Sequence, residues 1–245
     1  MLLKTTEGKR PGPRRIFVYG PPGVGKSTFA SKAPNSLFIP LEDGVNDLDV
    51  CRVDKLKTWD EYRSTLTELL NGDYNFKWIV TDSADWLEKL ICADIAKNQG
   101  VKTVGDIPYG RGFDYVLAYW QNVTLAFETL REKGVGCIFI GHADVKRHED
   151  PETESFDRFV PMLSKKSSAH LVGWCDEVLF ARFATRVKTV DGKFGQKQTR
   201  AVGDSRRVLR CDDRPTATAK NRLGLPPEMP LDWSEFAKFL PKKGA

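Results

Sequence analysis

The octapeptide Gly20-Pro21-Pro22-Gly23-Val24-Gly25-Lys26-Ser27 fits the pattern G-x-x-x-x-G-K-[ST], and it follows the apolar run Ile16-Phe17-Val18-Tyr19. A short apolar run of this kind predicts a buried strand. Glycines let the backbone N–H groups of such a loop turn towards phosphate oxygens, and a helix that starts near Gly25 directs its positive end at them. The stretch therefore predicts a strand, a phosphate-binding loop (P-loop) and a helix, in that order.

The residue types in this loop point to a nucleoside triphosphate. The Lys26 ammonium is expected to reach the β- and γ-phosphates, and the Ser27 hydroxyl is expected to coordinate a magnesium ion. The predicted cofactors are therefore ATP and Mg²⁺. The predicted nucleotide-binding residues form one continuous segment, which consists of Gly20, Pro21, Pro22, Gly23, Val24, Gly25, Lys26, Ser27 and Thr28.

The length and composition fit one sizeable globular unit. With 245 residues, 40% of them hydrophobic, the chain can bury one substantial core. Its apolar runs have the length of strands, and the segment Met1-Leu2-Leu3-Lys4 is too short for a signal peptide. We therefore expect a cytoplasmic protein without a membrane partner. The five cysteines contain no C-x-x-C pair, which argues against disulfides and zinc.

The charge is distributed unevenly along the chain. Residues 181–245 hold 15 of the 38 basic residues and 7 of the 33 acidic residues, a net charge of +8, whereas the preceding residues carry a net charge of −3. A basic surface of this kind suits a polyanion such as nucleic acid, although a solvated face or a set of phosphate contacts made to a neighbouring subunit would give the same pattern.

Apolar strands alternate with helical patterns through most of the chain. Strands are expected at 15–19, 36–39, 50–53, 78–82, 136–140 and 177–181, and helices after the P-loop and at 58–71, 84–98 and 114–133. This alternation predicts an α/β fold with a mostly parallel sheet covered by helices on both faces. After residue 182 the pattern changes to a predicted β-hairpin around Asp191-Gly192, a strand at 207–210 and a C-terminal helix at 233–240. Residues 1–14 are expected to form a flexible arm.

Three polar residues at strand ends are candidates for the chemistry. Asp82 ends an apolar strand, where a carboxylate can hold Mg²⁺ together with Ser27; the alternative is a helix N-cap. Hydrolysis also needs a group that orients or deprotonates the attacking water, and Glu42, just past the second strand, is the candidate, with Asp43 as its competitor. His142 follows the fourth predicted strand, where it could sense the γ-phosphate or serve a structural role.

Two further sets of residues are candidates for contacts with anions. Lys220 and Arg222 are alternate residues of an extended segment, so both could meet one triphosphate, and a neighbouring subunit can supply such cations. The segment 144–166 is long, charged and poor in apolar residues, and it is expected to lack regular structure. It ends with four candidates for single-stranded nucleic-acid binding, Phe156, Phe159, Lys165 and Lys166, of which the two rings could instead anchor the loop.

Taken in order, these motifs resemble the RecA-like ATPase core over roughly residues 15–225. The chain is similar to the phage-encoded, single-domain RecA-like proteins grouped with the Sak-type single-strand annealing ATPases, for which Tyr109-Gly110-Arg111-Gly112, a helix with Trp120, and Gly141-His142 are typical. The resemblance implies a single domain over 15–245, with 182–225 as its basic hairpin and finger region. It also implies ATP bound between adjacent subunits of a ring or filament.

The same resemblance assigns roles to the candidates. Glu42 becomes the catalytic base and His142 the sensor, with Lys220 and Arg222 as fingers acting on the neighbour's nucleotide and 144–166 as the DNA-contacting loop. His142 replaces the glutamine that recombinases carry, which favours annealing, or assistance to a phage annealing or single-strand-binding protein, over strand exchange.

These assignments predict an ATPase, stimulated by single-stranded DNA, that acts in phage DNA recombination or repair in the host cytoplasm. A ring-shaped helicase-like motor and a P-loop kinase remain alternative functions, as does a nucleotide-gated binding module without useful hydrolysis.

Overall fold

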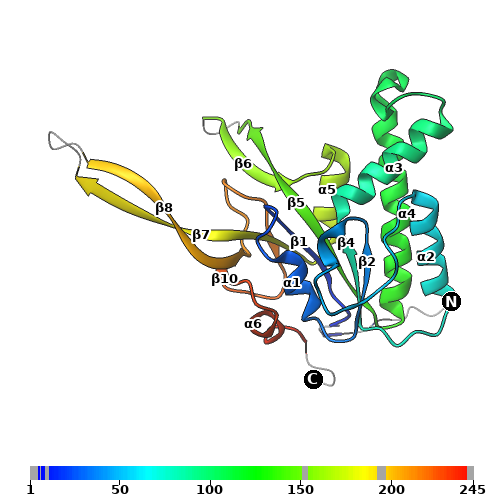
Figure 1. Ribbon diagram of the computed structural model, residues 1–245, viewed down its shortest axis with the longest axis horizontal. Coiled ribbons are helices and arrows are strands. Elements are labelled where there is room, and N and C mark those ends of the chain that lie inside the picture. The colour runs from blue at the N-terminus through cyan, green and yellow to red at the C-terminus, as the bar shows by residue number, and fades with distance from the viewer. Residues whose placement is uncertain (1–4, 6, 9–10, 151–153, 192–196, 242–245) are drawn as a thin grey trace.

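The P-loop strand lies in the middle of one large sheet (Figure 1). The computed structural model describes residues 5, 7–8, 11–150, 154–191 and 197–241, with side chains from 185 to 204 outside that description. The sheet order is β10-β8-β7-β1-β5-β4-β2-β3, with β6 on β5 and β9 on β7. The strands are β1 (Arg15–Gly20), β2 (Ser36–Pro40), β3 (Cys51–Arg52), β4 (Trp78–Asp82), β5 (Gly136–His148), β6 (Phe156–Pro161), β7 (Glu177–Asp191), β8 (Lys197–Arg210), β9 (Lys220–Asn221) and β10 (Glu228–Pro230).

The central strands run parallel, as the sequence predicts. β1 pairs in parallel with both β5 and β7, and β4 and β2 extend the parallel sheet on the β5 side. The chain therefore leaves β1 towards one side of the sheet and returns to its other side at β7. Ligands of open α/β sheets bind at the carboxyl ends of the strands where the order reverses in this way. The P-loop follows β1 at that position.

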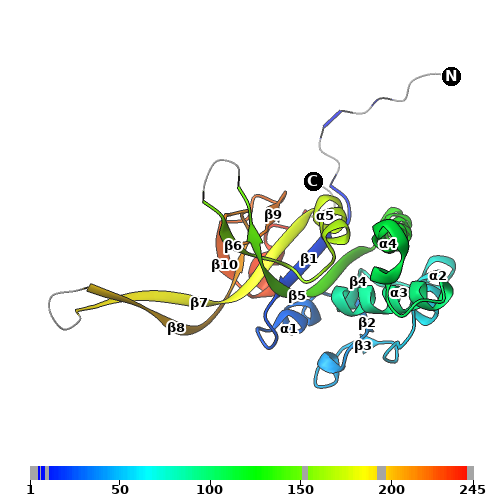
Figure 2. The same cartoon turned by 90° about the horizontal axis from the view of Figure 1, so that it is seen from above.

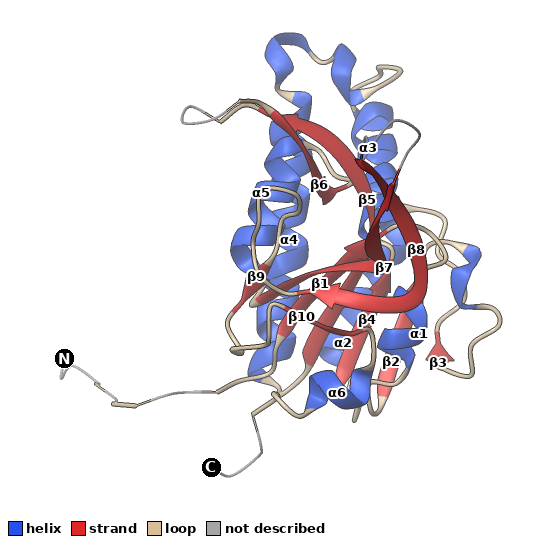
Figure 3. Cartoon of the chain, turned by 90° about the vertical axis from the view of Figure 1, so that its left-hand side faces the viewer, coloured by secondary structure: helices blue, strands red, loops and turns tan. Residues whose placement is uncertain are grey.

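Helices cover both faces of the sheet (Figure 3). They are α1 (Lys26–Ser31), α2 (Trp59–Asn71), α3 (Ala84–Asn98), α4 (Gly112–Glu132), α5 (Lys165–Trp174) and α6 (Trp233–Ala237), with short 3₁₀ turns η1 (Asp43–Val45), η2 (Val104–Asp106) and η3 (Pro108–Gly110). Alternate residues of β1 belong to two cores: Phe17 and Tyr19 pack towards α2–α5, and Ile16 and Val18 pack towards α1 and α6. Within the described part of the chain, every helix is too short or too polar to pass through a lipid bilayer.

A local sequence signal explains where α2 begins. α2 begins at a capping box in which the Thr58 hydroxyl accepts from the Glu61 backbone N–H at 3.2 Å while the Glu61 carboxylate accepts from the Thr58 N–H. Its apolar face buries Trp59, Tyr62 and Leu66, in agreement with the predicted helix at 58–71. The C-terminal helix is shorter than predicted, since α6 ends at Ala237.

The predicted unstructured segment 144–166 is wrong for most of its length. β5 continues from the core to His148 and pairs antiparallel with β6, so that Ala143 lies opposite Pro161 and His148 opposite Phe156. Most side chains along this ladder are exposed or half-buried, because the hairpin stands beyond the body of the sheet. The charged composition of the segment gave no sign of the strand pairing. Lys165 and Lys166 are the first residues of α5 and do not belong to a loop.

The C-terminal extension is a long hairpin, as the sequence predicts. β7 and β8 pair antiparallel from Phe180–Arg210 to Asp191–Lys197 and project from the body (Figures 1 and 2). The register shifts between Phe183 and Thr185, which marks a β-bulge where the ribbon leaves the sheet. The predicted Asp191-Gly192 turn and the first residues of the predicted N-terminal arm lie partly outside the described residues.

Candidate functional site

The P-loop has the backbone that its sequence predicts. Gly23 has φ of 73° and Gly25 φ of 102°, conformations that side-chain-bearing residues rarely adopt. The Lys26 ammonium is buried, and it donates to the carbonyl oxygens of Gly20 at 3.0 Å and Pro21 at 2.9 Å. Burial lowers the pKa of Lys26, while the nearby carboxylates of Asp82 and Glu42 oppose that shift. A phosphate group would therefore meet a desolvated cation within a loop of turned N–H groups, and these residues fit a nucleotide.

Ser27 and Asp82 meet at the foot of this loop. The Ser27 hydroxyl donates to Asp82 Oδ2 at 2.7 Å, which joins the start of α1 to the end of β4. An oxygen pair of this kind suits Mg²⁺, which binds through one or two protein oxygens, water and substrate phosphates. Burial raises the pKa of Asp82 from 3.8 to about 6, and the Ser27 hydrogen bond opposes the shift. The alternative role of Asp82 as a helix N-cap finds no support, because Ser83 occupies the cap position of α3.

The ionised carboxylate of Asp82 is expected to lower the stability of the fold. Because its pKa is higher in the folded chain, Asp82 destabilises the fold as the pH rises above about 4, and the penalty is complete above about pH 6. Asp82→Asn should therefore raise the free energy of unfolding by about 1 to 3 kcal/mol at pH 8 and leave it nearly unchanged at pH 4. Denaturant titrations at the two pH values test this expectation. Equal stabilisation at both would contradict it. The same substitution should remove Mg²⁺-dependent turnover.

His142 and Glu42 lie at the same edge of the sheet. His142 is paired with Gly20 across β1 and β5, and Pro40, two residues before Glu42, is paired with Asp82. The charge of Glu42 acts on both Lys26 and His142, so the three side chains lie near one another at this edge of the sheet. Asp43 instead forms an exposed ion pair with Lys55 at 2.8 Å, which favours Glu42 over Asp43 for the catalytic role.

A buried carboxylate that is absent from the sequence-based candidates, Asp85, holds His142. Asp85 accepts from the His142 backbone N–H at 3.0 Å, and its carboxylate lies 3.0 Å from His142 Nδ1. This hydrogen bond raises the pKa of His142, although burial opposes the shift. Nδ1 then carries a proton, and the two hydrogen bonds to Asp85 fix the orientation of the ring. The spacing Asp82-x-x-Asp85 at a strand-to-helix junction is the signal that could have identified this pair.

The candidates for DNA contacts lie on the β5–β6 hairpin and at the start of α5. Phe156 packs against His148, with ring centroids 5.2 Å apart, and Phe159 stacks on Phe180 at 4.9 Å while 40% of its surface stays exposed. Lys165 is exposed, and Lys166 pairs with Asp114 at the start of α4. The loop-anchor and the base-contact interpretations both fit Phe159, since one part of its surface is packed and the rest is free.

This hairpin is attached to the nucleotide edge by hydrogen bonds. The Met162 N–H donates to the His142 carbonyl at 2.9 Å. The Tyr19 hydroxyl, one residue before the P-loop, lies 2.6 Å from the Thr218 carbonyl and 3.1 Å from the Phe159 carbonyl. The strand that carries the predicted sensor thus continues into the strands that carry the predicted DNA contacts.

Lys220 and Arg222 lie away from the P-loop of their own chain. Lys220 is opposite Val178 at the start of β7, near the amino ends of the central strands. Its ammonium donates to the carbonyls of Val172 and Gly173 at the end of α5, whereas Arg222 pairs with the buried Asp176 at 3.1 Å and is 53% exposed. Neither can contact a nucleotide in the same subunit, so any finger role requires a neighbour.

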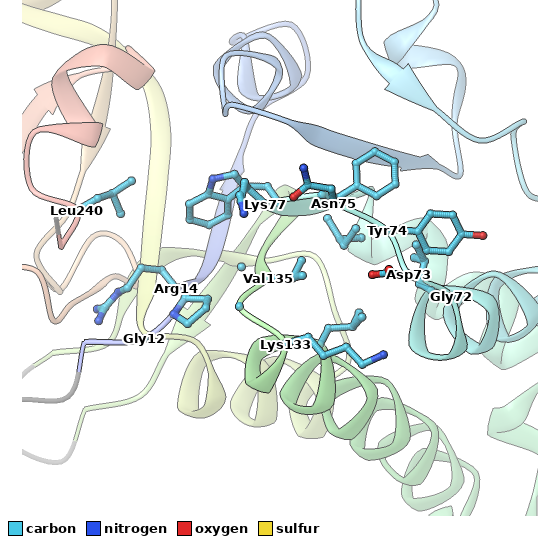
Figure 4. A pocket seen from close by; sticks show the side chains of 18 of the residues that line it. Gly12, Arg14, Gly72, Asp73, Tyr74, Asn75, Lys77, Lys133, Val135 and Leu240 are labelled. Carbon is cyan, nitrogen blue, oxygen red and sulfur yellow. The ribbon is translucent and has the colours of Figure 1, made fainter. Parts of the chain in front are cut away.

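A cavity of about 1020 Å³ opens at the same end of the sheet, far from the phosphate loop (Figure 4). It lies between the amino ends of β1, β4 and β5, and its lining includes Arg14, Tyr74, Lys77, Trp78 and Lys133. None of the residues that line it belongs to the P-loop or to the carboxylate set around it, so this cavity is separate from the candidate nucleotide site.

Comparison with known proteins agrees with the geometry. Residues 12–223 match the protein family described as an AAA domain. The SPbeta prophage-derived uncharacterized protein YorG of Bacillus subtilis (strain 168) is 22% identical over 149 residues, which make up 58% of this chain and 43% of that protein. The chain thus matches less than half of that relative's length. Because the family match covers most of the chain and contains the whole phosphate loop, the chain belongs to the AAA domain family of P-loop ATPases.

Proposed function

We propose that this chain is an ATP-dependent single-stranded DNA-binding protein of RecA-like type that acts in phage DNA recombination or repair, by annealing or by assisting an annealing or single-strand-binding partner. One observation carries the proposal. The edge that gathers Lys26, Glu42, Asp82 and His142 is continuous with the β5–β6 hairpin, through β5 itself and through the Met162–His142 hydrogen bond. The similarity to a prophage-derived protein supports the phage context.

The proposed reaction is ATP hydrolysis. Lys26 and the loop N–H groups hold the phosphates, and Ser27 with Asp82 would hold Mg²⁺, which neutralises charge on the β- and γ-phosphates. Glu42 orients and deprotonates the attacking water. His142, held by Asp85, would donate from Nε2 towards the γ-phosphate when both ring nitrogens are protonated, the form that its raised pKa favours. Hydrolysis would break that contact, and β5 would carry the resulting change to the hairpin.

The proposed assembly is a ring or filament in which one subunit completes the site of the next. The positions of Lys220 and Arg222 support it, since both lie at the opposite end of the sheet from their own P-loop. Arg222 is the better candidate finger because half of its side chain is exposed, while the Lys220 ammonium is held by two carbonyls. A head-to-tail arrangement of identical subunits would bring such a cation to the neighbour's nucleotide.

The test is ATP turnover with and without single-stranded DNA. We expect turnover to rise with DNA, and Glu42→Gln to lower it by about 100-fold or more while ATP still binds, because general base catalysis is lost. Asp43→Asn is the matched control, since the neighbouring Asp43 is engaged with Lys55, and it should leave turnover unchanged. A turnover rate that no nucleic acid changes would contradict the proposal and point to a kinase.

A further inference from the structure

A cation from the C-terminal hairpin lies against the phosphate loop. Arg207 is on β8, 182 residues after Gly25 in the chain, yet its Nη1 lies 2.9 Å from the point that a Cβ on Gly25 would occupy. Its Cδ lies 3.7 Å from the same point. A side chain at position 25 would therefore collide with the guanidinium, so Arg207 lies close against the loop at Gly25 in the same subunit.

The pairing of β7 with β8 explains this placement. Ala181 and Leu209 are opposite each other and buried in the core on the α1 side of the sheet. Two residues further along the ribbon, Phe183 and Arg207 are again opposite each other and share that face, because alternate residues of a strand point the same way. They stand just beyond the end of β1, which brings them over the P-loop.

A bulge and a ring contact direct the guanidinium. The β7–β8 register shifts immediately after Phe183, and bulges of this kind re-aim side chains next to functional sites. The guanidinium carbon of Arg207 lies 5.9 Å from the centre of the Phe183 ring, within the range of a cation–π contact. Phe183 is 42% exposed, so this ring supports Arg207 rather than filling the core.

The donors of Arg207 are available. Among the described residues, the guanidinium of Arg207 forms no hydrogen bond or ion pair. Its electrostatic partner there is the Phe183 ring, through the cation–π contact. The other side chains around the loop are mostly carboxylates, Glu42, Asp82 and Asp85, and the Lys26 ammonium is already bound to two carbonyls. A triphosphate at this loop would need more positive charge than Lys26 alone supplies.

We propose that Arg207 binds the α- and β-phosphates of the nucleotide in its own subunit, and that Phe183 is a positioning residue for its guanidinium. The assignment to these two phosphates follows from the contact with the Gly25 backbone, because the loop N–H groups hold the α- and β-phosphates whereas the lysine reaches the γ-phosphate. A planar guanidinium suits two phosphate oxygens at once. The inference rests on the proposed nucleotide binding at the P-loop.

The experiment measures the dissociation constants of ATP and ADP by calorimetry, without DNA. Arg207→Ala should weaken both nucleotides by about 10- to 100-fold, the loss expected for a charge-assisted hydrogen bond. Arg206→Ala is the matched control: it removes the same charge from the adjacent, exposed residue of β8, and both constants should stay unchanged. Arg207→Lys keeps the positive charge but loses the planar set of guanidinium donors, so its affinity for both nucleotides should lie between those of the wild type and Arg207→Ala. This variant also tests the proposal if Arg207→Ala folds poorly.

Phe183 is tested by a double-mutant cycle. Phe183→Leu should weaken ATP and ADP by a smaller factor than Arg207→Ala, and it should have no further effect in the Arg207→Ala background, because it acts through the guanidinium. An equal loss in both backgrounds would show that Phe183 does not position Arg207, and would overturn that part of the proposal.

The outcomes separate this inference from the proposed function. If the wild-type chain binds no ATP, or binds it as well after Lys26→Ala, the proposed function fails first. If Lys26→Ala removes binding and Arg207→Ala behaves like Arg206→Ala, Arg207 is not a phosphate ligand. A loss confined to ATP would place the guanidinium at the γ-phosphate and overturn the assignment to the α- and β-phosphates.

Discussion

Lys26→Ala is expected to reduce ATP turnover by at least about 100-fold, to the limit of detection. The ammonium is buried in the loop, where its charge is poorly solvated and thus interacts strongly with phosphate oxygens. Its present hydrogen bonds, to the carbonyls of Gly20 and Pro21, hold the side chain inside the loop. Alanine would leave the triphosphate facing Glu42 and Asp82 without that cation. A steady-state assay of phosphate release checks the expectation.

Two controls separate the loss of chemistry from the loss of fold. Removing a buried cation whose pKa is lowered by desolvation should not destabilise the chain, so the melting temperature of the Lys26→Ala variant should be at least that of the wild type. Lys32→Ala is the matched substitution, because Lys32 is the exposed C-cap residue of the same helix, and the turnover of this variant should equal that of the wild type. Retained turnover in Lys26→Ala would refute the nucleotide site.

The same variant tests the shared site between subunits. A Lys26→Ala subunit keeps Arg222, and an Arg222→Ala subunit keeps its P-loop. If Arg222 acts on the neighbour's nucleotide, a mixture of the two inactive variants should regain part of the turnover, since some interfaces then combine an intact loop with an intact cation. No recovery at any mixing ratio would argue against a finger role for Arg222.

Trp120→Ala is expected to lower the free energy of unfolding by about 3 to 5 kcal/mol. Trp120 is fully buried on α4 and packs its ring edge-on against Phe139 of β5. Its indole N–H donates at 2.8 Å to Glu88, a buried carboxylate that also accepts from the Ser164 N–H at 2.6 Å. Alanine would create a large cavity and remove a partner from Glu88, and a buried acceptor left without its donor adds to the loss. Denaturant unfolding followed by circular dichroism measures the change.

Two other tryptophan substitutions set the scale. Trp86 is 38% exposed on α3 and contacts the Lys89 ammonium at 3.9 Å, so Trp86→Ala should cost about 1 kcal/mol or less. Trp120→Phe keeps most of the volume and removes the hydrogen bond to Glu88, so it should fall between the two. A Trp120→Ala loss no larger than that of Trp86→Ala would show that this core is not as tightly packed as its burial indicates.

The sequence predicted those parts of the site that are encoded by neighbouring residues. The loop from Gly20 to Ser27 and the strand that ends in Asp82 are each defined within a few positions, by glycine spacing and by an apolar run. Glu42 and His142 could be placed because the carboxyl ends of parallel strands meet at one edge of a sheet. The parallel core was predicted from the alternation of apolar strands with helical patterns, and the C-terminal hairpin from the Asp191-Gly192 turn signal.

The parts that were missed depend on pairing between distant residues. The β5–β6 hairpin has a charged composition, and it forms because β5 gains a partner strand beyond the body. Arg207 reaches Gly25 only through the register of β7 with β8 and the bulge beside Phe183, which no local pattern reveals. Lys220 and Arg222 lie in one segment as expected. Their partners within the chain, the end of α5 for Lys220 and Asp176 for Arg222, could not be predicted from sequence spacing.

The Tyr19 hydroxyl has a mechanical consequence. Burial raises the pKa of this phenol well above its usual range, so the group keeps its proton and remains a donor at neutral pH. It is shared between the carbonyls of Phe159 and Thr218, and it belongs to the residue that enters the P-loop. The hydroxyl thus links the end of β1 to the β5–β6 hairpin and to the segment before β9, so a displacement of the hairpin would act directly on the residue that precedes the P-loop.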